Sequence, residues 1–110
     1  MAETFKNAYL DVPNSEADFY TCPSSTTAIV LTLRMTNVDG TNAATVDAKV
    51  LDNDGSTNSM IASTINVPAD STLELAGASK IVLETGDKIR LTASADNDLE
   101  AFASILEIDL

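Results

Sequence analysis

The sequence predicts an all-β protein, an antiparallel β-sandwich of jelly-roll or immunoglobulin-like type with about eight short strands. Apolar residues recur at every second position in short runs, which is the pattern of half-buried strands whose side chains alternate between two faces. Aromatic residues are scarce, with three Phe, two Tyr and no Trp, so the core must consist mainly of Ile, Leu, Val and Ala. Such small aliphatic side chains suit two sheets packed about 10 Å apart.

The strongest strand signal lies between residues 28 and 36. On a regular strand Ile29, Leu31, Leu33 and Met35 would share one face, with polar residues on the other. The predicted strands cover residues 4–12, 18–22, 27–38, 44–51, 60–67, 73–75, 81–83, 88–94 and 100–108. Asp-Gly and Pro-containing turns separate them, because Asp-Gly readily adopts the positive φ that tight hairpins require. The Ala-rich segment 99–106 is also compatible with a helix, but its position after a turn favours a strand.

One domain, 1–110, is expected, in which residues 1–26 form either an N-terminal arm or edge strands. A chain of this length buries about two thirds of its unfolded surface and needs no metal or disulfide for stability. Cys22 is the only cysteine, so we expect a free, partly buried thiol rather than an intermolecular bridge. A reducing cytoplasm fits this composition, and the N-terminus lacks the features of a secretory signal.

The charge balance excludes several partners. Seventeen Asp and Glu against six Lys and Arg give a net charge of −11. An acidic surface without a basic stripe argues against direct nucleic-acid binding, since phosphates require Lys and Arg contacts. No segment reaches the roughly 18 apolar residues of a membrane span.

The residue types argue against an enzyme and against a bound cofactor. The chain contains no histidine, which removes the commonest general base and metal ligand, and its four glycines are scattered singly rather than forming a phosphate-binding loop. The oxygen-rich segments 52–58 and 96–98 are the candidate calcium-binding loops. Neither has the ligand spacing of an EF-hand, so we expect hairpin turns there and no metal site.

Some apolar residues fall on both faces of the predicted strands. Val30 lies opposite the row of Ile29, Val82 interrupts its short strand, and the row of Phe102, Leu106 and Ile108 lies opposite a second apolar row. Two interpretations remain open. A second covered face, with another subunit as the cover, would explain them, and so would an internal strand or a bulge that shifts the phase.

Three segments resemble small virion structural proteins of tailed bacteriophages. They are residues 65–73, 80–89 and 99–108, and the earlier segment 36–41 fits the same pattern. The resemblance spans about residues 27–108 and consists of strand-and-turn patterns without a catalytic signature. It implies an all-β module that assembles into a virus particle in the bacterial host cytoplasm.

Within that resemblance, the expected role is a capsid decoration (cement) protein that bridges major capsid subunits. The resemblance implies a homo-oligomer, with a trimer favoured, and an acidic chain suits the outer surface of a head. A neck or tail component is the alternative. The candidate subunit contacts are Phe5, Tyr9, Leu10, Val30, Val82, Phe102, Leu106 and Ile108. The segment around Phe5, Tyr9 and Leu10 is a candidate arm that adds to a neighbour's sheet.

A different class of function is a carbohydrate-binding β-sandwich. Such modules present aromatic platforms to sugar rings. The candidates here are few, and Phe19-Tyr20 is the only adjacent aromatic pair.

Overall fold

The computed structural model describes residues 2–77 and 79–110 and confirms the all-β prediction. The segment 99–106 is strand, not helix. The strands are β1 (Glu3–Asp11), β2 (Ala17–Thr21), β3 (Thr26–Asn37), β4 (Ala44–Leu51), β5 (Asn58–Val67), β6 (Thr72–Ala76), β7 (Ile81–Leu83), β8 (Lys88–Ala93) and β9 (Leu99–Asp109). Nothing in the described residues is a helix long and apolar enough to cross a membrane.

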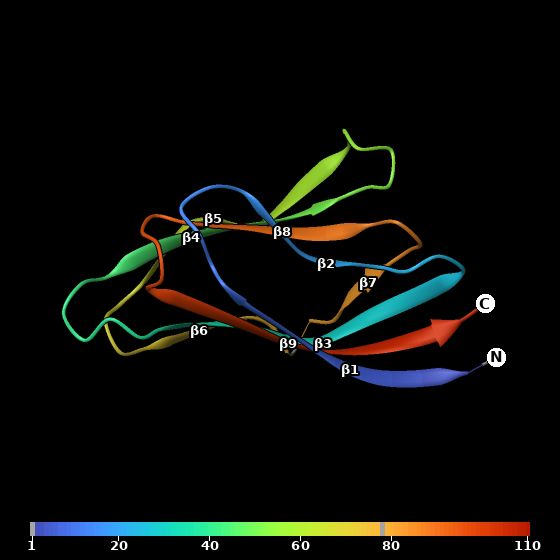
Figure 1. Ribbon diagram of the computed structural model, residues 1–110, viewed down its shortest axis with the longest axis horizontal. Helices are drawn as coiled ribbons and strands as arrows, with labels where there is room; N and C mark the ends of the chain where they lie inside the picture. The colour runs from blue at the N-terminus through green and yellow to red at the C-terminus, as the bar shows by residue number, and fades with distance from the viewer. Residues whose placement is uncertain (1, 78) are drawn as a thin grey trace.

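The strands form two sheets that pack face to face (Figure 1). The sheet that we call the β1 sheet has the order β1-β9-β3-β6, with β7 also pairing β3. The β2 sheet has the order β2-β8-β4-β5. All pairings are antiparallel, and the two ends of the chain lie side by side at one end of the sandwich (Figure 1).

The pairing follows a nested order that defines a jelly roll. β4 pairs with β5, β3 with β6, β2 with β8 and β1 with β9, as if one long hairpin were folded at its tip. Rolling this hairpin up adds the pairs of β9 with β3 and β8 with β4, which close the two sheets. Two four-stranded sheets with these connections are the jelly-roll arrangement, and β7 is an addition to it.

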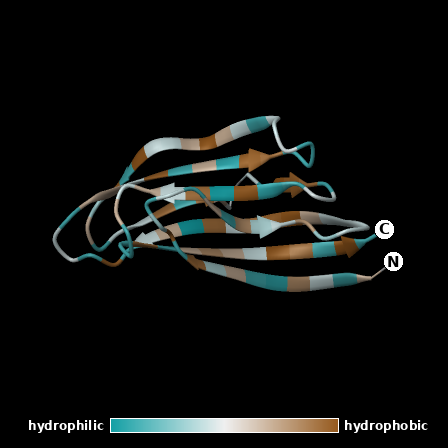
Figure 2. Ribbon diagram, turned by 45° about the horizontal axis from the view of Figure 1, so that its top comes forward, coloured by the Kyte–Doolittle hydropathy of each residue, from teal (hydrophilic) through white to brown (hydrophobic). Residues whose placement is uncertain are grey.

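Small aliphatic residues fill the space between the sheets, as the composition predicts. Brown and teal positions alternate along the strands in Figure 2 because each strand presents one face to the core. The largest fully buried hydrophobic side chains are Leu33, Met35, Leu83, Ile89, Leu91, Leu99, Ile105, Val12, Val30, Val46 and Val67. The strand predicted at 88–94 is observed as β8, and Ile89, Leu91 and Ala93 lie on its buried face.

A bulge in β3 overturns the predicted face of its first half. The register against β9 shifts between Val30 and Thr32, so Leu31 has no direct partner. One extra residue reverses the alternation, because side chains have a period of two along a strand. Val30 therefore points inward with Leu33 and is fully buried, and Ile29 points outward. The prediction that placed Val30 among subunit contacts is wrong for this reason.

Two buried polar side chains organise the ends of the sandwich. Asn37 donates from Nδ2 to the carbonyls of Asn42 and Val67, both at 3.0 Å. At the other end, the carboxylate of Asp87 accepts from the backbone N–H groups of Glu84 and Asn53. These bonds satisfy loop backbone that would otherwise be buried without partners.

Gly86 is required in the turn before β8. Its φ is +84°, and an added Cβ would lie 2.7 Å from the Cβ of Asn53. Glycine is therefore needed both for its positive φ and for the close approach of the neighbouring loop.

We expect the same substitution to have opposite outcomes in β3 and β7. Val30→Ala should lower the free energy of unfolding by about 1.5–3 kcal/mol, because Val30 is fully buried. Val82→Ala should change it by less than about 0.5 kcal/mol, because Val82 is 61% exposed. Urea unfolding followed by circular dichroism measures both, and equal losses would contradict the placement of Val30 in the core.

Candidate interaction surface

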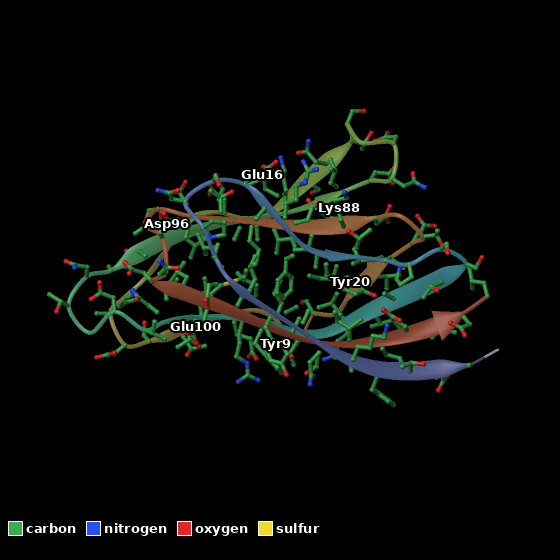
Figure 3. The ribbon with its side chains drawn as sticks, in the orientation of Figure 1. Tyr9, Glu16, Tyr20, Lys88, Asp96 and Glu100 are labelled. Atoms are coloured by element: carbon green, nitrogen blue, oxygen red, sulfur yellow. The ribbon has the colours of Figure 1, made fainter. Side chains whose placement is uncertain are left out.

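A buried carboxylate connects the two sheets near the chain termini. Tyr20 of β2 lies between the sheets, and its hydroxyl donates to Oε2 of Glu107 on β9 at 2.5 Å (Figure 3). The other oxygen, Oε1, lies 3.1 Å from Nζ of Lys6 on β1. Glu107 is only 6% exposed, so both of its oxygens are occupied by partners within the sandwich. This geometry joins three strands across the core.

The environment of Tyr20 keeps its hydroxyl protonated. Burial, and after it the hydrogen bond to Glu107, raises the pKa of Tyr20 far above its ordinary value of 10.0. Burial likewise raises the pKa of the Cys22 thiol, which is 1% exposed and lies 3.3 Å from the carbonyl oxygen of Thr26. A buried, protonated thiol is a poor nucleophile. Tyr20, Glu107 and Cys22 therefore stabilise the fold and present no accessible reactive group.

In the acidic turn between β4 and β5, the carboxylate oxygens accept hydrogen bonds from residues of the same turn. The carboxylate of Asp54 accepts from the N–H of Ser56 and from both the N–H and the hydroxyl of Thr57. These bonds, led by the Thr57 hydroxyl, lower the pKa of Asp54 to about 2. At the other end of the sandwich, Asp96 accepts from the N–H of Asn14 at 2.7 Å. Residues 2–77 and 79–110 hold no cluster of three or more metal-ligating side chains.

The outer face of the β2 sheet carries paired charges. Arg90 donates to Asp18 at 2.6 Å and to Glu16 at 3.1 Å, and Lys49 lies 2.8 Å from Glu16. Lys88 completes the group at 3.2 Å from Asp18. Hydrogen bonds from Lys49 to Glu16 and from Arg90 to Asp18 are the main causes that lower the pKa of the two carboxyl groups. These five charged side chains form ion pairs with one another, and this arrangement is compatible with exposure to water.

The outer face of the β1 sheet is different, and we call it the docking face. One apolar row crosses four strands at consecutive register positions and consists of Phe5, Leu106, Ile29 and Val82. Phe5 is 73% exposed and Val82 61% exposed, so the row lies open at both ends. Ile108 lies beside it, one outward position further along β9.

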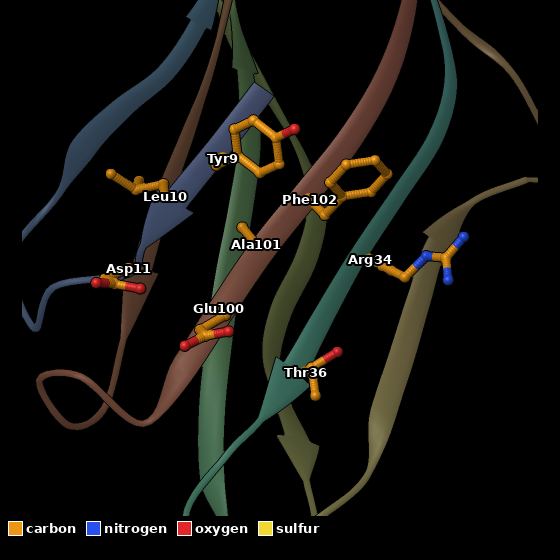
Figure 4. A pocket seen from close by; sticks show the side chains of 8 residues that line it. All are labelled: Tyr9, Leu10, Asp11, Arg34, Thr36, Glu100, Ala101 and Phe102. Carbon is orange, nitrogen blue, oxygen red and sulfur yellow. The ribbon is translucent and has the colours of Figure 1, made fainter. Parts of the chain in front are cut away.

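A second row on the docking face combines aromatic rings with an arginine. Tyr9, Phe102 and Arg34 occupy opposed positions on β1, β9 and β3. The rings of Tyr9 and Phe102 are tilted by 53° with centroids 5.5 Å apart, and the guanidinium carbon of Arg34 lies 5.9 Å from the Phe102 centroid. Edge-inclined rings and a cation over a ring are both favourable arrangements. They border a hollow of about 740 Å³ in the surface (Figure 4).

Two acidic residues lie on the far side of this hollow. Asp11 on β1 is directly opposite Glu100 on β9, and both are exposed (Figure 4). Like charges in directly opposed positions of a sheet are unfavourable. Among the described residues no ion pair involves either of them. A basic group from outside the chain would relieve this repulsion.

The structure brings six of the eight predicted contact residues to the docking face. They are Phe5, Tyr9, Val82, Phe102, Leu106 and Ile108. Val30 is in the core, and Leu10 points inward, where it packs against the core at the edge of the sandwich. Ile29 and Arg34 complete the docking face. Sequence reasoning missed Ile29, because the bulge that turns it outward depends on pairing with β9.

The adjacent aromatic pair Phe19-Tyr20 is not a platform. Both side chains pack against the core, because the register of β2 against β8 shifts between Asp18 and Tyr20. The exposed aromatic surface near the hollow comes from Tyr9, which is 71% exposed, and from Phe102 beside it.

Comparison with known proteins places the chain by its fold. No family model and no curated protein matches the sequence. A chain in the structure of infectious bursal disease virus, Gx strain, superposes with a TM-score of 0.57 at 11% identity, over 97% of this chain and 30% of that chain. A Bacillus endospore appendage, described as a disulfide-linked pilus, gives 0.56 at 15% identity, over 99% and 88%.

The third similar structure matches over nearly its whole length. A chain of the acid-stable capsid of Helicobacter pylori bacteriophage KHP30 gives a TM-score of 0.53 at 13% identity, over 100% of this chain and 95% of that chain. At such low identities the likeness shows a shared fold. This fold is common to a structure of infectious bursal disease virus, a bacteriophage capsid structure and a bacterial pilus.

Loss of the Tyr20 hydroxyl should lower the free energy of unfolding most below pH 10. The pKa of Tyr20 is raised on folding, so its stabilisation is complete below the unfolded value of 10.0 and is lost as the pH rises above it. We expect Tyr20→Phe to lower the free energy of unfolding by about 1–3 kcal/mol at pH 8. The difference from the native chain should shrink above pH 10 by up to about 1.4 kcal/mol per pH unit. A difference that stays constant to pH 11.5 in urea titrations would contradict this.

Cys22 should be chemically silent in the folded chain, because its thiol is buried and protonated. We expect iodoacetamide to label it only in denaturing guanidinium chloride, as read by mass spectrometry. Ser59→Cys, on the exposed strand β5, is the positive control for labelling under native conditions. Disulfide-linked species of the native chain on a non-reducing gel would overturn this placement.

Proposed function

We propose that this chain is a structural protein of a virus particle and that it decorates the capsid by binding through the docking face. The observation that carries the proposal is the contrast between its two outer faces. The β2 sheet presents charges that are paired within the chain, whereas the β1 sheet presents an open apolar row. Large exposed apolar patches mark interaction surfaces in folded proteins.

The shared fold supports this assignment. Two of the similar structures come from viruses, and one of them, a bacteriophage capsid structure, covers this chain from end to end. The described residues bring together buried polar groups that are satisfied by one another, which favours a structural role over catalysis. The Bacillus endospore appendage, a disulfide-linked pilus, is also an assembly of protein subunits.

Charge complementarity indicates what the docking face would meet. The opposed carboxylates of Asp11 and Glu100 suit a partner surface that carries Lys or Arg beside an apolar patch. A major capsid protein exposing such a patch at a subunit joint is the partner we propose. Burial of each large apolar side chain contributes about 1.5–3 kcal/mol, and association itself costs several kcal/mol, so several contacts must act together.

A neck or tail position remains the alternative within the same class. The same docking face would serve there, since the acidic surface suits either location. Particle imaging distinguishes them, because a decoration protein repeats over the head and a neck or tail protein is confined to one vertex.

Sugar binding is a second candidate, favoured by Tyr9 and Phe102 beside two carboxylates at the hollow. The apolar row extends well beyond this hollow to Val82, which fits a protein partner better than a sugar ring. A glycan array with the native chain and Tyr9→Ala tests the candidate. Glycan binding lost in Tyr9→Ala would favour it over capsid decoration.

We expect the chain to co-sediment with particles of the virus that encodes it, and charges on the docking face to weaken this binding. Leu106→Asp and Val82→Asp should each reduce binding at least about tenfold, because a buried charge without a partner is unfavourable. Met60→Asp, at an exposed position opposite Lys49 in the β2 sheet, is the matched control and should bind normally. Absence of the chain from purified particles by mass spectrometry would refute the proposal.

A further inference from the structure

The open edge of β1 is unlike the other sheet edges. β1 pairs with β9 at nine consecutive positions without a register shift. Its outward neighbour position is vacant in the sheet order, since β1 is the first strand of its sheet. Long, regular edge strands are templates for pairing with another chain, and proteins normally interrupt them.

The other sheet edges have features that disfavour pairing with another chain. β2 has five residues and a register shift, and β5 is offset from β4 by shifts on both sides of Ala48. In β5, Thr64 has a φ of +51° and its N–H is taken by Asp47. The edge formed by β6 and β7 is broken between them, where Lys80 donates to the carbonyls of Leu31 and Gly77.

The hydrogen-bonding direction along β1 follows from its two ends. The N–H of Val12 bonds to Leu99, and the carbonyl of Ala2 accepts from Asp109, both at 2.9 Å. Even-numbered residues of β1 therefore turn their backbone groups toward β9. Since backbone groups alternate along an antiparallel strand, the odd-numbered residues from Glu3 to Asp11 present N–H and C=O to the open edge. The same odd-numbered residues place their side chains on the docking face.

We propose that β1 pairs antiparallel with β1 of a second copy of this chain, centred on Asn7. In that register Phe5 of each copy is opposite Tyr9 of the other, and Asn7 is opposite Asn7. It uses the whole strand and matches every outward N–H with a carbonyl of the partner. The two β1 sheets then join into one sheet whose docking faces lie on the same side.

The charges on β1 are compatible with this pairing and make it sensitive to salt. An unpaired lysine at an edge strand disfavours pairing with another chain. Lys6, however, is paired with Glu107 of its own chain. Glu3 would lie opposite Asp11 at both ends, and each copy carries a net charge of −11. Association should therefore strengthen as ionic strength rises, because salt screens repulsion between exposed charges. A basic partner would show the opposite salt dependence.

The pairing is expected in the isolated chain, so it does not depend on the proposed function. Light scattering after size-exclusion chromatography should give the mass of two chains, increasingly so at higher salt. Asn7→Pro removes one N–H at the open edge, leaves the bonds to β9 intact and should give monomers. Asn7→Ser retains the N–H and should remain a dimer. A monomer at all concentrations, a trimer, or a dimer unaffected by Asn7→Pro would overturn the inference.

A charge reversal tests the proposed register without introducing a proline into β1. Glu3→Lys would place a cation opposite Asp11 of the second copy at both ends of the paired strands. We expect the dimer dissociation constant to fall by about tenfold. Glu84→Lys, exposed and remote from β1, makes the same change in net charge and is the control. Equal effects of the two reversals would show that the strands do not pair about Asn7.

Discussion

The pairing of β3 with β9 is the constraint on which the rest of the structure depends. It joins the middle of the chain to its end and unites the strands of the β1 sheet. Without it, β1 and β9 would be separated from β3, β6 and β7. The ladder spans Thr26–Asn37 and Leu99–Asp109, and its single bulge decides which side chains enter the core.

That bulge also shapes the docking face. By turning Val30 inward it places Ile29 outward, where it continues the apolar row between Leu106 and Val82. The outer face of the β2 sheet is charged instead of apolar, and there Arg90 and two lysines form ion pairs with Glu16 and Asp18. Exposed ion pairs of this kind contribute little to stability. Their consequence is a difference in surface character between the two sides of one sandwich, which gives the molecule a preferred side for contact.

The prediction of strands from sequence succeeded where turns delimit short alternating runs. Ala44–Leu51 and Ile81–Leu83 have the predicted bounds, and the other strands differ by one or two residues at their ends. The prediction of faces was correct for β9, whose residues alternate without interruption, and wrong for the first half of β3. A bulge is a property of two strands together, so a single run of residues does not reveal it. The buried partnership of Tyr20 with Glu107 was missed for the same reason, because it joins positions far apart in the chain.

The sequence by itself determined an all-β sandwich with an aliphatic core, because alternation and turn chemistry are local properties. It also determined the acidic net charge and the absence of histidine chemistry. Only the tertiary structure decided the strand order, the face on which each apolar residue lies, and the open edge at β1, whose pairing has no register shift. These depend on which distant strands become neighbours, and that choice is made by packing across the whole core rather than by any local run of residues.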